Sequence, residues 1–345
     1  MKFETTQESL IKVLSKLVRN ANQTTEIYKF IQIEPTCDDL ITLKSNNGTT
    51  LLSCKLPALN VSGNAVMIEA KKFFEVINKL KGNIIFNNGE ISCANSLINL
   101  EIIDDTYFQQ ENDEIKNETD FNLKEFKNVV KNRLFACDVT GHHILSAICI
   151  NKDDVVSTDG NKLSLGKLKD STNFDNLMLN KFFVEEMIKN FDTDIVKISD
   201  SSKKIIISDK STVMSCLKIN GTYPSYKGIL PNYSNGFCID KQKMIEALEL
   251  ILTITNDRTN LCILDITQNN LTLKAANEKK SGQTIIDIDY TGEAVKIGMN
   301  ALYLIAAIKN TNEDKININF EGSLTPFVVK TKDDLNVLMP VQLKK

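Results

Sequence analysis

The stretch FETTQESLIKVLSKL (Phe3–Leu17) decides the fold, because it sets a pattern that recurs along the chain. A short strand-like run leads into a helix whose apolar side chains recur at positions i, i+3, i+4 and i+7. The combination begins again, at intervals of about sixty residues, at Val66, Phe121, Leu177, Phe237 and Ile297. Repetition at a nearly constant interval indicates that one supersecondary unit is used six times.

Each predicted helix is followed by strand-like runs separated by turn residues. In the second unit the pair Asn88-Gly89 predicts a two-residue hairpin. Each unit therefore predicts the order β-α-β-β-β, and the chain as a whole predicts an α+β fold with helices on one side of its sheets. The predicted helices cover residues 8–19, 68–80, 123–133, 180–190, 240–251 and 299–309.

A chain of 345 residues is too long for a single hydrophobic core. The six units pair naturally into three domains, which we expect at residues 1–118, 119–235 and 236–345. Polar stretches at 109–120 and 232–236 are the candidate linkers between them.

The cysteines and histidines predict neither a disulfide framework nor a metal site. The eight cysteines show no CxxC spacing and lie mostly in apolar, strand-like runs, which is typical of reduced core thiols in a reducing compartment. His142 and His143 are adjacent and stand near no cysteine pair, so neither metal nor cofactor is expected. Residues 1–20 are amphipathic and no run reaches the ~18 apolar residues of a membrane span. We therefore expect a cytoplasmic protein without a membrane partner.

Positive charge is concentrated in the predicted helices. The chain has a net charge of -3, whereas the six helices together carry +6. If the helices share one surface, that surface suits a polyanion. The alternative is that lysine is simply a good helix former on a solvated face. Aromatic residues are not interleaved with the basic ones and no recognition helix is visible, which argues against base readout.

Three motifs complete the pattern: VVSTDGNKLSLG (155–166), GTYPSYKGILP (221–231) and VLMPVQL (337–343). With the MKF start and the sixfold repeat, they resemble the bacterial DNA polymerase III beta subunit, the sliding clamp. The resemblance covers the whole chain in order. It implies a DNA-clamp fold in which two copies close head to tail into a ring, with the helices lining the hole.

The resemblance also implies how the ring holds duplex DNA: topologically, with loose, sequence-independent phosphate contacts that permit sliding. The residues implied to face DNA are Lys12, Lys16, Arg19, Lys72, Lys79, Lys124, Lys127, Lys131, Lys181 and Lys189. The neutral stretch 20–25 stands where the family often carries a basic loop.

In the family the three motifs converge on one pocket, into which partners insert a short peptide containing Gln and Leu or Phe. The implied partners are the replicative polymerase, an ATP-driven clamp loader and other proteins with such peptides. The implied pocket residues here are Ile144, Leu145, Thr158, Gly160, Lys162, Leu163, Pro224, Ile229, Val337, Met339, Pro340 and Val341. Departures from the family at Asn161, Gly228 and Gln342 leave the peptide preference open.

Dimer closure would join Ile98 and Leu100 of one copy to Ile254 of the other. The resemblance implies a processivity factor, and the lack of a visible P-loop, nucleophile motif or metal-ligand cluster agrees with the expectation that it is not an enzyme. Two alternatives remain: a clamp-fold interaction scaffold that no longer loads on DNA, and a hydrolase using Asp159 or the His142-His143 pair.

Overall fold

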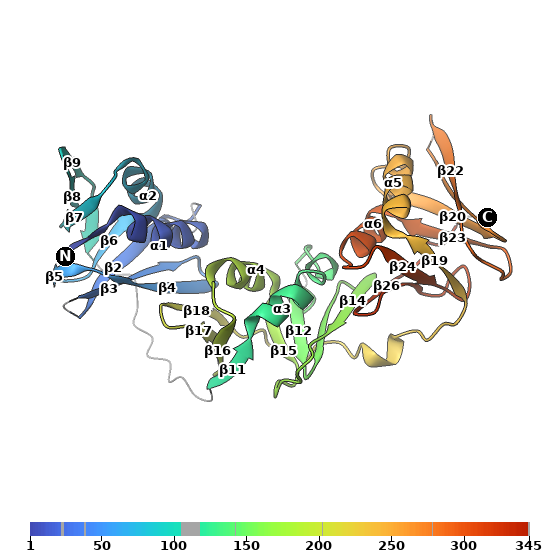
Figure 1. Ribbon diagram of the computed structural model, residues 1–345, viewed down its shortest axis with the longest axis horizontal. Coiled ribbons are helices and arrows are strands. Elements are labelled where there is room, and N and C mark those ends of the chain that lie inside the picture. The colour runs from blue at the N-terminus through green and yellow to red at the C-terminus, as the bar shows by residue number, and fades with distance from the viewer. Residues whose placement is uncertain are drawn as a thin grey trace. The chain divides into compact units, whose positions relative to one another are not determined.

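The computed structural model describes residues 1–21, 24–37, 39–104, 118–141, 143–201, 203–277 and 279–343 (Figure 1). It confirms the predicted α+β fold, with one helix in each of the six units. The helices are α1 (Gln7–Asn20), α2 (Ala70–Lys79), α3 (Leu123–Val130), α4 (Lys181–Asn190), α5 (Lys241–Leu252) and α6 (Ala301–Lys309).

The strands follow the predicted β-α-β-β-β order in every unit. They are β1 (Lys2–Thr6), β2 (Phe30–Cys37), β3 (Leu40–Asn46) and β4 (Thr50–Pro57); β6 (Val66–Glu69), β7 (Asn83–Asn87), β8 (Glu90–Cys93) and β9 (Ser96–Asn99); β11 (Glu118–Asn122), β12 (Ala147–Asn151), β13 (Asp154–Thr158) and β14 (Lys162–Lys167); β15 (Leu177–Asn180), β16 (Ile195–Asp200), β17 (Lys204–Ser208) and β18 (Thr212–Leu217); β19 (Gly236–Asp240), β20 (Leu261–Thr267), β21 (Asn270–Ala276) and β22 (Ser281–Asp287); and β23 (Val295–Asn300), β24 (Lys315–Asn319), β25 (Phe327–Lys330) and β26 (Asp334–Leu338). Two short strands, β5 (Leu59–Ser62) and β10 (Ile102–Asp104), are additional to this order.

Local sequence explains why these elements begin where they do. Thr6 precedes α1, and its side chain accepts a hydrogen bond from the backbone N–H of Ser9, as an N-cap does. Leu10, Leu14 and Leu17 form the buried face of the helix. The hairpin predicted between residues 87 and 90 is confirmed, since β7 and β8 pair across two residues with φ of 46° and 91°.

Helix α3 ends three residues earlier than the sequence predicted. α3 stops at Val130, whereas the periodicity extended it to residue 133. The chain turns at this point, where the N–H of Arg133 donates to the carbonyl of Val130 at 2.8 Å. The side chain of Arg133 is buried. It binds partners in the protein interior, whereas a residue on the exposed face of a continued helix would extend into solvent.

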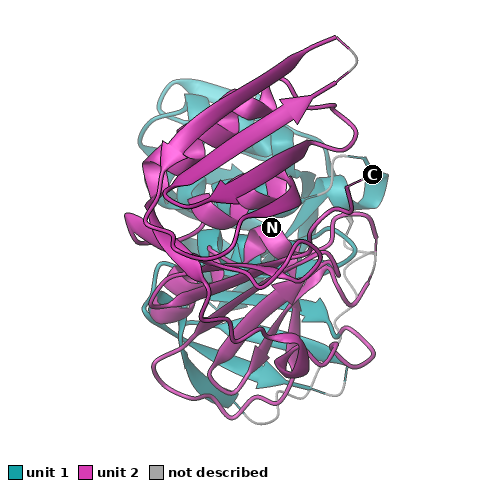
Figure 2. Ribbon diagram, turned by 90° about the vertical axis from the view of Figure 1, so that its right-hand side faces the viewer, with its two compact units in different colours: residues 1–124, 182–218 teal, residues 125–181, 219–345 magenta. Residues whose placement is uncertain are grey.

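The chain forms two compact units, one of residues 1–124 and 182–218, the other of residues 125–181 and 219–345 (Figure 2). Unit 1 contains a five-stranded sheet, β5-β1-β7-β8-β9, and a nine-stranded sheet, β10-β6-β2-β3-β4-β18-β17-β16-β11. The two parts of the larger sheet meet at the antiparallel β4–β18 ladder. In the core of unit 1, Phe3 stacks on Phe86 with ring centroids 5.0 Å apart, and Phe73 meets Phe86 edge-on.

Unit 2 contains an eight-stranded sheet, β15-β12-β13-β14-β26-β25-β24-β19, and a four-stranded sheet, β22-β21-β20-β23. Here β14 pairs antiparallel with β26. Helices α5 and α6 pack into the main core of the unit through Leu248 and Leu304. Because each large sheet combines strands from two of the predicted domains, the compact units cut across the expected boundaries, and the three-domain division stays a prediction.

All eight cysteines are free thiols, and six of them are buried. Cys37 and Cys238 are exposed, contrary to the expectation of core positions. Burial raises the pKa of Cys54 to about 11 and that of Cys262 to about 12, so these thiols stay protonated at neutral pH. Within the described ranges, none of the helices has the length and apolar character that crossing a membrane requires.

Candidate binding site

The β14–β26 ladder brings the first and third motifs side by side within unit 2. Leu163 lies opposite Val337, and Lys162 lies opposite Leu338. Just beyond the ladder, the N–H of Met339 donates to the carbonyl of Asn161 at 2.8 Å. Segments about 175 residues apart in the sequence therefore form one continuous surface.

The turn between β13 and β14 is held by its own side chains. Thr158 Oγ1 donates to the carbonyl of Lys162 at 2.8 Å and accepts the N–H of Gly160 at 3.1 Å. One carboxylate oxygen of Asp159 accepts the N–H groups of Asn161 and Lys162, both at 2.9 Å. Gly160 has a φ of +88°, which glycine adopts without strain.

The side chain of Lys162 is held by contacts in the predicted pocket and is not a free cation. Its side chain is 9% exposed, its Nζ forms an ion pair with Asp159, and the same atom lies 4.3 Å from the ring centroid of Tyr303. Tyr303 comes from α6 and was missed by the sequence analysis. An aromatic ring in an apolar helix gives no local signal that it will meet a lysine from another motif.

Two buried tyrosines anchor the second motif, residues 221–231. Tyr226 OH donates to Asp154 Oδ2 at 2.7 Å, and both Tyr223 and Tyr226 are about 4% exposed. Burial, followed by the hydrogen bond to Asp154, raises the pKa of Tyr226, so the hydroxyl stays protonated. These anchors leave Pro224 and Ile229 exposed, with Ile229 at 61%.

The structure gathers many of the predicted pocket residues around one apolar cluster. Leu163 and Val337 are buried in it with Tyr223 and Tyr226, and Ile144 packs against it. A Cβ on Gly221 would lie 2.6 Å from Ile144 Cδ1, which shows how closely the second motif approaches this residue. The other predicted residues lie around the turn, on the second motif or along the tail: Thr158, Gly160, Lys162, Pro224, Ile229, Met339, Pro340 and Val341.

Two apolar side chains remain available at the surface of this region. Met339 is 45% exposed, and Ile229 is the more exposed of the two. Beyond Met339 the tail runs along β23, where the N–H of Val341 donates to the carbonyl of Gly298 at 2.8 Å. Leu145 is partly buried but does not belong to the apolar cluster.

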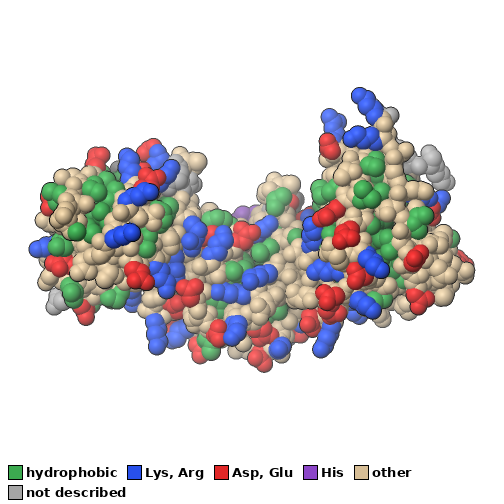
Figure 3. Space-filling view, turned by 45° about the horizontal axis from the view of Figure 1, so that its top comes forward, with side chains coloured by type: hydrophobic (Ala, Val, Ile, Leu, Met, Phe, Trp, Pro, Cys, Tyr) green, Lys and Arg blue, Asp and Glu red, His purple; other side chains and the backbone are tan. Residues whose placement is uncertain are grey.

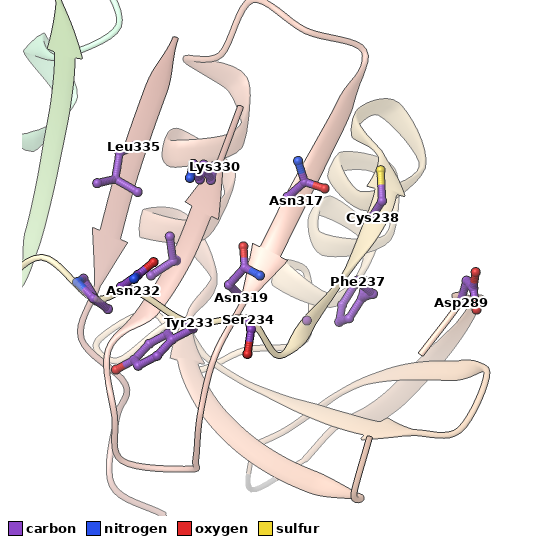
Figure 4. A pocket seen from close by; sticks show the side chains of 13 residues that line it. Asn232, Tyr233, Ser234, Phe237, Cys238, Asp289, Asn317, Asn319, Lys330 and Leu335 are labelled. Atoms are coloured by element: carbon purple, nitrogen blue, oxygen red, sulfur yellow. The ribbon is translucent and has the colours of Figure 1, made fainter. Parts of the chain in front are cut away.

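A depression of about 520 Å³ lies elsewhere in unit 2 (Figure 4). Asn317 and Asn319 enter it from β24, and Tyr233 and Ser234 enter it from the segment before β19. Asparagine, serine, aspartate and lysine side chains are among those that line it, and it shares no residue with the predicted pocket. Leu335 connects the two regions, because it lines the depression and packs against the apolar cluster.

The helix cations predicted to face DNA divide into three groups. Those with exposed side chains and no partner among the described residues are Lys12, Lys79 and Lys131. Those exposed but paired are Arg19 with the Asn190 amide, Lys72 with Glu69, Lys124 with Asp194, and Lys189 with Glu186. Those partly buried are Lys16, Lys127 and Lys181.

Lys16 contributes to the interior of unit 1 more than to its surface. Its side chain is 14% exposed, and its Nζ donates to the carbonyl of Asn190, the last residue of α4, at 2.5 Å. A lysine at the C-terminal end of a helix satisfies a carbonyl that lacks an intrahelical partner.

Figure 3 shows Lys and Arg side chains interspersed with Asp and Glu, so positive charge does not form an unbroken field on the face that it draws.

The predicted closure residues lie at or near free sheet edges. Ile98 is on β9, the last strand of the five-stranded sheet, and Leu100 follows it; both are partly buried. Ile254 is also partly buried, and a Cβ on Gly282 of the edge strand β22 would overlap its side chain.

Comparison with known proteins agrees with this arrangement. A family model, described as "DNA polymerase III beta subunit, C-terminal domain", matches residues 227–342. The beta sliding clamp of Rickettsia bellii is 25% identical over 341 residues, covering 89% of this chain and 90% of the relative. Over most of its length the chain is similar to bacterial DNA polymerase III beta subunits. The beta sliding clamp of Chlamydia muridarum is 22% identical and covers 99% of both chains.

Solved beta subunits share the fold over nearly the full chain. The DNA polymerase beta subunit of Streptococcus pyogenes has a TM-score of 0.92 at 22% identity, covering 99% of this chain and all of the other. The sliding clamp of Bartonella birtlesii, solved bound to griselimycin, has a TM-score of 0.92 at 20% identity with the same coverage.

The hydrolase alternative finds no support in the geometry. The carboxylate of Asp159 is engaged by two N–H groups and by Lys162, while His142 lies outside the described residues and His143 is exposed. The described part of the chain contains no group of three His, Cys, Asp or Glu that could hold a metal. The relatives reported above are named only as clamps or polymerase beta subunits, and no catalytic family is indicated.

Proposed function

We propose that this chain is a sliding clamp that encircles duplex DNA and tethers the replicative polymerase and other partners for processive synthesis. The observation that supports this most strongly is the match to solved beta subunits over 99% of the chain at a TM-score of 0.92. Similarity to proteins named beta sliding clamps favours this function over a scaffold that no longer loads on DNA. The clamp itself carries out no chemistry, works in the cytoplasm and depends on an ATP-driven loader for opening.

Closure is proposed to join β9 of one copy to β22 of a second copy. Each is the last strand of its sheet, and an unpaired strand edge can pair with another edge. The charges nearby have opposite signs: Glu90 of β8 lies opposite Asn99 of β9 and Glu101 follows β9, whereas Lys279 and Lys280 precede β22. Two such junctions close a head-to-tail homodimer, with Ile98, Leu100 and Ile254 as its apolar contacts.

Replacing Lys279 and Lys280 together by glutamate should weaken the dimer roughly tenfold, because like charges would then face each other across the junction. Native mass measurement should show a species of twice 38.7 kDa for the unmodified chain and a larger monomer fraction for the variant. Adding Glu90→Lys and Glu101→Lys should restore the dimer. A dimer unaffected by all of these changes would place the junction elsewhere.

Peptide docking is proposed at the surface formed by the three motifs. Buried Leu163 and Val337 supply its floor, and exposed Ile229 and Met339 supply side chains that can close over an apolar anchor. Methionine suits a site that must accept several partners, because its side chain is flexible.

Replacing Ile229 and Met339 together by alanine should raise the Kd for a short synthetic peptide containing Gln, Leu and Phe roughly tenfold to a hundredfold. Both side chains would lose the apolar area that they bury against the ligand. Fluorescence anisotropy measures the Kd, and griselimycin is a second probe. Ile195→Ala with Leu217→Ala is the matched control, since these side chains are 58% and 60% exposed and lie in unit 1. Equal Kd values for the two double variants would contradict the proposed pocket.

A further inference from the structure

The interior of unit 2 contains a buried arginine that neither DNA contact nor peptide contact explains. The side chain of Arg133 is 1% exposed, and its ion-pair partner Asp334 is 3% exposed. The guanidinium donates to Asp334 Oδ1 at 2.5 Å, to the carbonyl of Leu165 at 2.9 Å and to that of Val129 at 2.8 Å. One side chain thus connects the end of α3 with β14 and β26.

A chain of buried polar groups extends this connection. Ser164 Oγ donates to Asn336 Oδ1, 2.6 Å away, and Asn336 Nδ2 donates to the carbonyl of Ala307 in α6 at 3.2 Å. From the other side, Ser157 of β13 donates to the carbonyl of Arg133 at 2.5 Å. The network therefore reaches β13 and β14, which flank the turn of the first motif (the TDG turn). It also reaches β26, which leads into the C-terminal tail, and helix α6.

The residue of β14 that lies against the guanidinium is a glycine. Gly166 lies opposite Asp334 in the β14–β26 ladder, and any Cβ at residue 166 would overlap Arg133. Gly166 does not have a positive φ, so its backbone conformation does not require glycine. The missing side chain is explained by the close approach of the arginine.

Stability alone is a weak reason for such a pair. Burying two charges costs desolvation that their attraction only partly offsets, and well-packed apolar residues often do as well. Burial lowers the pKa of Arg133, while the adjacent Asp334 acts in the opposite direction. The best-attested use of a buried polar pair is to specify one pairing register among several.

The register of β26 on β14 is what the proposed peptide pocket depends on. With Gly166 opposite Asp334, Leu163 lies opposite Val337 at the other end of the ladder. A strand slipped by two residues would keep the same face but move Val337 and Met339 away from the TDG turn. Asp334 and Asn336 alternate with Val337 along β26 and do not line the pocket.

We propose that Arg133 and Asp334 are a positioning pair, which fixes the register of β26 on β14 and thereby holds the two walls of the peptide pocket together. This inference rests on the proposed peptide pocket. It assigns a specific part in peptide binding to residues that touch no peptide.

The test replaces both members of the pair, Arg133→Met with Asp334→Leu, so that no lone charge stays buried. The double variant should fold and dimerise, yet bind the Gln-, Leu- and Phe-containing peptide roughly tenfold more weakly. Amide hydrogen exchange of residues 335–339 should become faster. Asp334→Asn, the second variant, keeps the side-chain shape but leaves the buried Arg133 charge without its carboxylate partner, so it should raise the Kd at least as much.

The control is Ile207→Ala, which removes a buried side chain from the nine-stranded sheet of unit 1 and should leave the peptide Kd unchanged. Wild-type Kd values for both the double variant and Asp334→Asn would overturn the positioning role. So would a control that raises the Kd as much as they do. Peptide binding by the unmodified chain tests the pocket itself, so failure of the pocket is distinguished from failure of the pair.

Discussion

Gly166→Ala should lower the unfolding free energy of unit 2 by about 3 to 5 kcal/mol, although it adds a single methyl group. The new Cβ would occupy the position of the Arg133 guanidinium, which Asp334 and the carbonyl of Leu165 hold in the interior. The guanidinium would have to leave its partners, and a buried charge separated from its partner is strongly destabilising. Because the chain forms two compact units, hydrogen exchange of β14 amides measures this effect better than one global transition does.

Gly228→Ala is the matched control for this prediction. Apart from its own neighbours in the chain, no atom of the described residues lies within 4 Å of a Cβ built at Gly228, and its φ is not positive. Its stability should stay within about 1 kcal/mol of the unmodified chain. Equal exchange rates in β14 for Gly166→Ala and Gly228→Ala would mean that the guanidinium does not lie beneath Gly166.

Replacing Lys12, Lys79 and Lys131 together by glutamine should shorten the retention of the loaded clamp on circular DNA and reduce its salt dependence. Lys12 lies on α1, Lys79 on α2, and Lys131 directly follows α3; all three are exposed and have no side-chain partner in the described part of the chain. Each phosphate contact contributes about 0.9 to the slope of log affinity against log salt. Three lost contacts should therefore lower the slope by about 2.7, measured as release from the circle across a salt series.

The matched control replaces three exposed lysines that lie outside the helices, Lys55, Lys152 and Lys315. It removes the same total charge and should leave the salt dependence unchanged. Lys16→Met should act differently from either triple variant. It should destabilise the contact between α1 and α4 rather than change the salt slope, because Lys16 Nζ is bonded to Asn190. A slope lowered equally by both triple variants would contradict a DNA-facing role for the helices.

Most of the fold could be predicted because it rests on local periodicity. The six strand-helix starts, the Asn88-Gly89 hairpin and the order of the strands follow from apolar spacing and turn residues, which short segments contain in full. The end of α3 could not be predicted in this way. Arg133 comes last in a run of cations in the predicted helix, and only its tertiary partner Asp334, 201 residues away, explains its burial.

The candidate pocket was predicted through family resemblance rather than from local pattern. Nothing in the residues near Leu163 or Val337 indicates that their strands pair, because pairing across such a separation depends on the whole chain. Tyr303 and the tyrosines beneath the second motif add contacts that the motifs alone did not predict. The charge of the helices was likewise counted correctly, but the count could not separate Lys12, which is exposed, from Lys16, which is largely engaged inside unit 1.

The most direct test of the central claim is to load the unmodified chain onto circular and onto linear duplex DNA of the same sequence, and to measure how long each retains it. A ring that holds DNA topologically should stay on the closed circle and run off the ends of the linear form, and cutting the circle should release it. Equal retention on the two forms, or sequence-dependent retention on the linear one, would contradict the account.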